Sequence, residues 1–457
     1  MIVACALFMQ NLDGTVVATA LPVMARAFGS DPLHMNVALT SYLLSLAVFI
    51  PVSGWVADRY GAKVVFGSAI AVFTVGSVLC GMSTGLAELV GARIVQGIGG
   101  AMMVPVGRLV LLRSVDKSEL VAAMAWLTVP ALVGPIVGPP VGGFLATYVD
   151  WRWIFYVNVP IGVLGIGLAW RFVPDVREPA PGRLDGWGLV WAGVALVCVM
   201  GAGETAGRGM IPGVYVAGLA VVGVLAGAGY WWHAGRVAAP LLDLGLLRVA
   251  TFRASVGAGS LFRVGVGAIP FLLPLMLQLG FGLSPVQSGL VTFSAAVGAI
   301  AMKPAAQYAL RVFGFRRTLG WNGAAGAVLL GVMGLFRPSW PMAALYGVLI
   351  LGGFVRSLQF TAFNTIAYAD IPRARMSAAT SLYSTLQQVS LTLGITVGAA
   401  ALEFARGMSG HGDPALGDYS VAFGVVAMFS LLASPLSFRL SEDAGAELSG
   451  RRVVEGR

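Results

Sequence analysis

The sequence predicts an all-α integral membrane protein that crosses the bilayer fourteen times. Its 457 residues are 58% hydrophobic and only 11% charged, whereas soluble chains carry about 25% charged residues. A membrane-spanning helix needs about 20 predominantly apolar residues, and runs of that kind follow one another along the whole chain. These runs are 1–24, 37–56, 64–83, 88–111, 120–146, 153–172, 187–203, 213–232, 254–279, 287–308, 318–336, 341–366, 376–402 and 419–438.

The basic residues lie mostly on one side of the predicted bundle. Of the 29 Lys and Arg residues, nineteen fall in the loops of one face, five in the loops of the other face, and five within the runs. Because basic loops stay in the cytoplasm, we expect a multi-pass protein of the inner (cytoplasmic) cell membrane with both termini in the cytoplasm. The net charge of +9 then reflects topology, and no nucleic-acid partner is expected.

Two longer cytoplasmic segments, 173–186 and 233–253, flank the seventh and eighth runs. These two runs therefore look like an insertion between two halves of six helices each. The predicted domains are an N-terminal six-helix bundle over 1–172, a linker with two inserted transmembrane helices over 173–253, and a C-terminal six-helix bundle with a short cytoplasmic tail over 254–457.

A polar turn connects the second and third runs with the sequence Gly-Trp-Val-Ala-Asp-Arg-Tyr-Gly-Ala-Lys, from Gly54 onward. Gly54 and Gly61 allow close backbone approach, and Asp58 with Arg59 supplies a charge pair that one conformation can hold and another can break. The segment 311–317 is a weak repeat of this turn, with a glycine at the corresponding position and no acidic residue. A surface loop of a soluble protein is the alternative, which the flanking apolar runs disfavour.

One acid, Asp13, lies at membrane depth, about halfway along the first run. Burying a charge there costs several kcal/mol unless it is paired or solvated. A carboxylate balanced between desolvation and a nearby cation can load and release a proton. Arg93 in the fourth run is the expected counter-ion, and Gln96 can hold its orientation. The alternatives are a permanent structural salt bridge at Asp13 and a static network between Arg93 and the backbone.

The fifth run is rich in glycine and proline. Proline removes a helical hydrogen bond, and glycine removes side-chain bulk. This helix can therefore bend and pack closely against a neighbour. The residues concerned are Gly134, Pro135, Gly138, Pro139, Gly142 and Gly143.

These motifs resemble those of major facilitator transporters. The turn from Gly54 matches the signature Gly-x-x-x-Asp-Arg-x-Gly-x-(Arg/Lys) between the second and third helices. Arg93–Gly100, which includes Gly97, resembles the fourth-helix motif Arg-x-x-Gln-Gly-x-Gly-(Gly/Ala), and Gly134–Gly143 resembles a signature typical of antiporters. The resemblance implies a major facilitator fold, with substrate bound between the two six-helix halves near the midplane.

Within this superfamily, Leu12–Pro22 resembles the first-helix motif of the fourteen-span drug:proton antiporters of the EmrB/QacA type. Three further stretches, 32–35, 101–109 and 314–317, look closest to the MdtD branch. The resemblance implies that Asp13 and Arg93 couple protons to transport, and that the chain exports its substrate.

The second half departs from the drug-pump pattern in carrying three cations within its runs: Arg263, Lys303 and Arg356. No acid lies at membrane depth in these helices to neutralise them, which points to an anionic substrate, either an organic anion or a metal-carboxylate chelate. The alternative is that these side chains snorkel to the interface. Polar residues that could add hydrogen bonds to substrate are Gln278, Gln359, Asn364 and Gln388.

We therefore expect a monomeric, proton-coupled efflux antiporter that exports small molecules by alternating access, with the proton as coupling ion and no cofactor or metal. An exporter of lipophilic cationic drugs, or a uniporter or importer of the same fold, is the alternative. An intramembrane enzyme would need paired catalytic groups at depth, yet all three histidines fall in predicted loops. The three cysteines have unrelated spacings, so neither a disulfide nor a metal site is expected.

Overall fold

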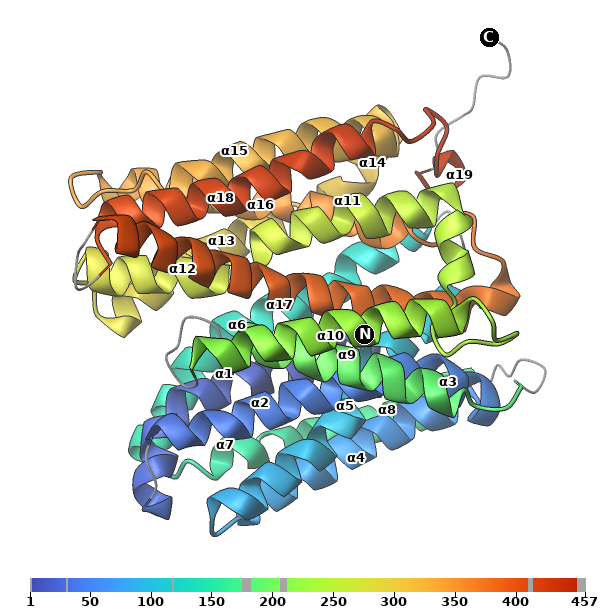
Figure 1. Cartoon of the computed structure of the whole chain (residues 1–457), viewed down its shortest axis with the longest axis horizontal. Coiled ribbons are helices and arrows are strands. Elements are labelled where there is room, and N and C mark those ends of the chain that lie inside the picture. The colour runs from blue at the N-terminus through green and yellow to red at the C-terminus, as the bar shows by residue number, and fades with distance from the viewer. Residues whose placement is uncertain are drawn as a thin grey trace.

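The computed structural model describes residues 2–29, 32–116, 119–174, 182–205, 212–409 and 414–449. These residues form helices joined by turns, and no strand occurs among them (Figure 1). Each of the fourteen predicted runs is occupied by helix. In the first half the helices are α1 (Ile2–Phe28), α2 (Pro32–Phe49), η1 (Ile50–Val52), α3 (Ser53–Tyr60), α4 (Ala62–Met82), α5 (Leu86–Ser114), α6 (Leu120–Tyr148), α7 (Trp153–Tyr156) and α8 (Asn158–Phe172).

The remaining helices continue in the predicted order. The two central ones are α9 (Gly186–Thr205) and α10 (Gly213–Ala234). After them come η3 (Leu244–Arg248), α11 (Ala250–Gly267), α12 (Ile269–Leu275), η4 (Met276–Gly280), α13 (Pro285–Ala301), α14 (Lys303–Arg317), η5 (Thr318–Asn322), α15 (Gly323–Met333), α16 (Met342–Ile366), η6 (Arg373–Arg375), α17 (Met376–Ser409), α18 (Leu416–Ser437) and α19 (Ala446–Ser449).

Among the described residues, ten helices are long and apolar enough to cross a bilayer. The number is eleven when Gln287–Ala301 and Ala306–Met333, which meet at 83°, are counted as one bent span. The chain is therefore a multi-pass membrane protein.

Two glycines in left-handed backbone conformations mark equivalent turns of the two halves. Gly61, at φ 89°, ends α3 and leads directly into α4, and Gly314, at φ 72°, interrupts α14. A positive φ costs other residues more than it costs glycine. The turn from Gly54 and the segment 311–317 are therefore similar in backbone geometry as well as in sequence.

Figure 1 shows helices α1–α8 gathered in the lower part of the view and α11–α18 in the upper part, with α9 and α10 lying between them at the front. In the lower group α1 packs on α6, and α5 packs on both α2 and α4. In the upper group α11 packs on α17 and α18. Helix α9 pairs with α10 and contacts both α2 and α17. The inserted pair therefore covers part of the seam between the two groups.

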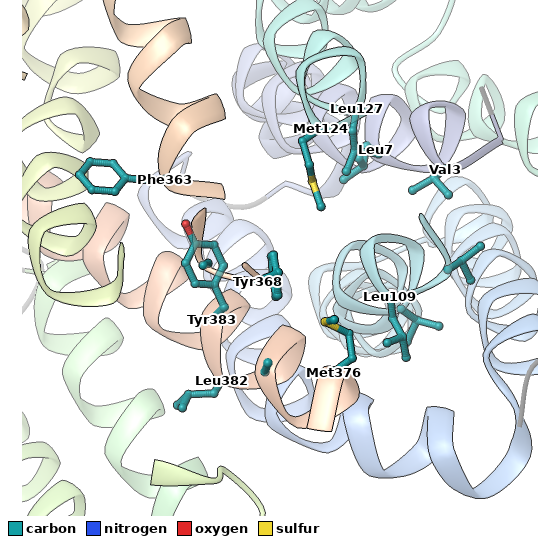
Figure 2. Packing of buried hydrophobic residues seen from close by; sticks show 14 of the residues in the cluster. Val3, Leu7, Leu109, Met124, Leu127, Phe363, Tyr368, Met376, Leu382 and Tyr383 are labelled. Atoms are coloured by element: carbon teal, nitrogen blue, oxygen red, sulfur yellow. The ribbon is translucent and has the colours of Figure 1, made fainter. Parts of the chain in front are cut away.

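The largest cluster of buried apolar side chains includes residues from both groups. Figure 2 shows Leu109 of α5 and Met124 of α6 on one side, and Met376 and Tyr383 of α17 on the other. Apolar side chains therefore close the two groups against each other at this end of the molecule. We call it the Asp58 end, because the turn from Gly54 also lies there.

Candidate functional site

Asp13 lies on α1, where its side chain is fully buried against α5. Arg93 Nη1 donates to Asp13 Oδ2 at 2.5 Å, and both side chains have 0% relative exposure. The counter-ion expected from the sequence is thus the one that the structure places beside Asp13. A buried pair of this kind is costly to break, since removal of one partner leaves an uncompensated charge worth about 3–5 kcal/mol.

Gln96 connects the two charges, as expected from its position one helical turn after Arg93. Its Oε1 accepts from Arg93 Nη1 at 2.5 Å, and its Nε2 donates to Asp13 Oδ1 at 2.8 Å. Asn158 of α8 also donates to Asp13 Oδ1, at 3.1 Å. Ser77 of α4 accepts from both amides, at 2.8 and 3.2 Å. Three helices besides α1, namely α4, α5 and α8, therefore form one hydrogen-bonded network with the carboxylate.

Hydrogen bonding in this network is incomplete. Arg93 Nε donates to the carbonyl of Ala38 at 3.2 Å, whereas Arg93 Nη2 and Asn158 Oδ1 have no hydrogen-bond partner among the described residues. The guanidinium carbon of Arg93 lies 4.2 Å from the centre of the Tyr42 ring, a cation–π contact. Each charge therefore has more than one polar neighbour.

Close helix packing positions this network. A Cβ atom on Gly97 would lie 2.6 Å from Ser45 Cβ on α2, and Ser45 itself donates to the carbonyl of Ile94. On the opposite side, Cβ atoms on Gly134 and Gly138 of α6 would lie 2.9 Å from Asn11 and 2.1 Å from Thr15 of α1. The glycines of α6 therefore pack on the segment of α1 that carries Asp13.

The remaining residues of the glycine and proline motif behave differently. Gly142 is buried, and a Cβ on Gly143 would meet nothing within 4 Å. The side chains of Pro135 and Pro139 lie outside the described residues, although α6 runs from Leu120 to Tyr148 as one helix. Of the motif's glycines, Gly134 and Gly138 therefore pack closely on α1, whereas Gly143 does not.

The turn from Gly54 contacts α17 in the other group of helices. A Cβ on Gly54 would lie 2.8 Å from the carbonyl oxygen of Ser377, and the Ser377 hydroxyl donates to Asp58 Oδ2. Asp58 Oδ1 accepts from Arg113 Nη2 of α5 at 3.2 Å. Arg59 is exposed. In this conformation Asp58 therefore pairs with Arg113, and the pair of Asp58 with Arg59 stays a prediction for another conformation.

The cations of the second half lie in three different surroundings. Arg263 on α11 is 1% exposed, and its Nη2 donates to the Tyr383 hydroxyl of α17 and, at 3.5 Å, to Asn364 Oδ1 of α16. Lys303 is buried at the start of α14, where it donates to Thr361 at 3.4 Å. Arg356 is half-buried on α16. Arg263 thus lies in a polar cluster formed by α11, α16 and α17.

Among the predicted polar residues, only Asn364 joins Arg263 through a hydrogen bond of the described chain. Gln359 is occupied by helix packing, since it donates to the carbonyl of Leu319 and accepts from Asn322. Gln388 lines a small gap between α2, α9 and α17. Gln278 is half-buried in η4.

Sequence reasoning does not find five side chains of these clusters. Asn158, Ser77 and Tyr42 complete the network around Asp13, and Tyr383 and Arg108 complete the cluster around Arg263. The first four are neutral residues in apolar runs and carry no signal of their own. Arg108 does carry one, because it is a cation inside the fourth run.

Repeated apolar spans in two groups of helices, one of which encloses a buried ion pair, are typical of a polytopic membrane transporter. The chain belongs to the Major Facilitator Superfamily, whose family model matches residues 3–395 and 256–453.

Two relatives share the name "Putative multidrug resistance protein MdtD". The relative from Serratia proteamaculans is 40% identical over 87% of this chain and 83% of its own length. The relative from Klebsiella pneumoniae is 36% identical over 99% of this chain and 96% of its own. The resemblance to the MdtD branch is confirmed.

Solved structures share the fold at low identity. The human organic anion transporter MFSD10 (TETRAN) has a TM-score of 0.70 at 15% identity, covering 95% of this chain and 98% of its own. The proton:xylose symporter XylE has a TM-score of 0.68 at 14% identity, covering 98% and 97%. The predicted major facilitator fold is thereby confirmed.

Proposed function

We propose that this chain is a proton-coupled efflux antiporter of the inner membrane that exports small molecules by alternating access. The buried network of Asp13, Arg93, Gln96 and Asn158 carries the proposal. Asp13 is an ionisable acid at membrane depth, and its partners come from two other helices, α5 and α8. The relatives named for multidrug resistance support export. The division into two six-helix halves with an inserted pair remains a prediction.

Protonation of Asp13 would weaken its attraction to Arg93, since the pair would then be a cation beside a neutral acid. Gln96 and Asn158 can keep hydrogen bonds to either form of the carboxyl group. The free energy that opposes separation of α1 from α5 would therefore fall on protonation. In this scheme proton binding from the outside favours one orientation of the transporter and proton release into the cytoplasm favours the other.

In this scheme the Asp58 end opens and closes during transport. We place it at the cytoplasmic face, because its loops hold the excess of basic residues. The contacts of Gly54 and Asp58 with Ser377 close this face in the present conformation. Transport requires those contacts to separate when substrate enters from the cytoplasm.

Arg263 supports an anionic substrate, such as an organic carboxylate or its metal chelate. Its charge is buried, and its partners among the described residues are neutral. A cation without a counter-ion repels cationic drugs and attracts anions. Export of lipophilic cationic drugs remains the second candidate, because the relatives are named for multidrug resistance. A uniporter or importer of the same fold is the third.

The deciding experiment compares Asp13→Asn with wild type in everted membrane vesicles under an imposed pH gradient. We expect the variant to lose proton-driven uptake of substrate into the vesicles while remaining inserted. Asp116→Asn, at an exposed site, is the matched control and is expected to transport normally. The variant with both Asp13→Asn and Arg93→Gln removes the uncompensated charge and separates loss of coupling from loss of folding. Undiminished pH-driven uptake by Asp13→Asn would reject the proposal.

The same vesicles distinguish the substrate classes and the direction of transport. A screen should include both lipophilic cations and carboxylates, since each candidate predicts transport of only one group. Reversing the pH gradient should reverse the flux of an antiporter. A uniporter would show flux that ignores the gradient.

A further inference from the structure

A second group of buried charges lies where α5 meets α17, separate from the network around Asp13. Arg108 of α5 is 5% exposed and Arg263 of α11 is 1% exposed. Their guanidinium carbons lie 5.3 and 4.8 Å from the centre of one aromatic ring, that of Tyr383 on α17. Two cations from the two groups of helices thus share one ring.

The hydrogen bonds of Arg108 are long and its partners are neutral. Its Nη1 donates to the hydroxyls of Tyr368 and Ser384, at 3.4 Å each, and its Nη2 donates to Gln387 Oε1 at 3.3 Å. Within the part of the chain that the structure describes, its Nε is buried without a hydrogen-bond partner, as is the Nε of Arg263. No carboxylate of the described residues forms an ion pair with either guanidinium. Each guanidinium therefore has an N–H donor that no described residue accepts from, and neither has a counter-ion among the described residues.

Such an arrangement is unfavourable unless something else compensates the charge. Burying a cation without a paired anion costs several kcal/mol, and two cations near each other repel. The face of the Tyr383 ring offsets part of this cost, by about 0.5–2 kcal/mol for each cation–π contact. A planar anion that accepts two hydrogen bonds from a guanidinium would offset considerably more.

We propose that Arg108 and Arg263 together form an anion subsite for the carboxylate or sulfonate group of the substrate, with Tyr383 between them. On binding, the anion replaces the Tyr383 hydroxyl as the partner of Arg263 and fills the free donors of Arg108. This inference rests on the anionic substrate of the proposed function and adds Arg108 as a specificity-determining residue. Because the two cations belong to different groups of helices, an anion held by both also draws α5 and α11 together.

The test measures binding of naphthalene-2-sulfonate to the purified full-length protein in detergent. This sulfonate is charged at every pH used, and naphthalene-2-sulfonamide is its uncharged control. Arg108→Gln and Arg263→Gln are each expected to raise the Kd for the sulfonate at least tenfold without changing the Kd for the sulfonamide. Arg108→Lys, which keeps the charge but not the paired donors, should show a smaller loss. Arg311→Gln, at an exposed site, is the matched control and should bind as wild type.

One further variant is expected to change the affinity for the sulfonate in the opposite direction. Misfolding cannot explain a gain in affinity. Tyr383→Phe keeps the ring and removes the hydroxyl that accepts from Arg263, and we expect it to bind the sulfonate severalfold more tightly. Unchanged binding in Arg108→Gln, or no gain in Tyr383→Phe, overturns the subsite. If wild type binds no sulfonate at all, the anionic substrate of the proposed function fails as well. The assignment of Asp13 is tested separately in vesicles, so the two failures are distinguishable.

Discussion

Replacing Gly54 with alanine should shift the protein away from the conformation described here. The added Cβ would lie 2.8 Å from the carbonyl oxygen of Ser377 and 3.2 Å from Ser381 Cβ. Backbone atoms on α17 would have to move, because contacts under 3.0 Å are not tolerated by Cβ atoms. The Ser381 hydroxyl also donates to the carbonyls of Ile50 and Pro51. Both hydrogen bonds would lengthen as α17 moves away from α3.

Overpacking of this kind typically costs about 1–3 kcal/mol. The substitution raises the free energy of the conformation in which the Asp58 end is closed. It does not raise the free energy of a conformation in which α3 and α17 are separated. The ratio of open to closed molecules should therefore rise by a factor of about 5 to 150, since 1.4 kcal/mol corresponds to tenfold. A transporter that is open about 1% of the time would become open in roughly 5% to 60% of molecules.

Spin labels at Tyr60 and Arg373 provide the assay. Both side chains are exposed, and they lie at the Asp58 end on opposite sides of the interface. Pulsed electron–electron resonance should show a new population at longer separation in Gly54→Ala. Gly91→Ala, where a Cβ meets nothing within 4 Å, is the matched control. A distance distribution that is the same in Gly54→Ala and wild type would refute the reasoning.

Three further changes test other parts of the structure. Gly138→Val should destabilise the protein by about 1–3 kcal/mol, because the added side chain would collide with α1. Gly143→Val is the control and should leave the melting temperature nearly unchanged. Equal effects of the two substitutions on the melting temperature would contradict the packing described. Arg263→Ala should reduce organic-anion export more than export of a cationic dye, and equal losses in vesicle assays would count against an anionic substrate. Although burial acts to raise it, the pKa of Asp185 is held below its ordinary value of 3.8 by hydrogen bonds with His233 and two backbone amides. A lowered pKa stabilises the fold at pH values above the unfolded pKa, so Asp185→Asn should lower the melting temperature at pH 7, and that difference should shrink as the pH falls below about 4.

Hydropathy and charge position account for most of what the sequence could predict. A spanning helix must satisfy its backbone internally and expose apolar side chains, so its length and composition are visible in the chain. A charge at membrane depth is equally visible, because it is costly unless paired. Charge position thus singled out Asp13, whereas the choice of Arg93 among five cations within the runs came from the resemblance of its motif to that of the family.

Neutral partners could not be predicted in the same way. Asn158 is one amide in an apolar run, and nothing local indicates that it points at Asp13 on a helix 145 positions earlier. Gln359 illustrates the converse, since its side-chain amide, predicted to be available to substrate, is hydrogen-bonded to Leu319 and Asn322 of η5. Arg113 could not be predicted as a partner of Asp58 for a geometric reason, because the two side chains meet only when α3 and α5 pack together.

Helix α5 links the two charged clusters, since it carries both Arg93 and Arg108. They are fifteen positions apart, or about 22 Å along the axis, and one contacts Asp13 of α1 while the other contacts Tyr383 of α17. A movement of α5 that follows protonation of Asp13 would therefore alter the anion subsite. Since coupling between two ligands is reciprocal, the Kd for naphthalene-2-sulfonate should vary with pH in wild type and lose that variation in Asp13→Asn. The same pH dependence in both proteins would show that α5 does not transmit the change.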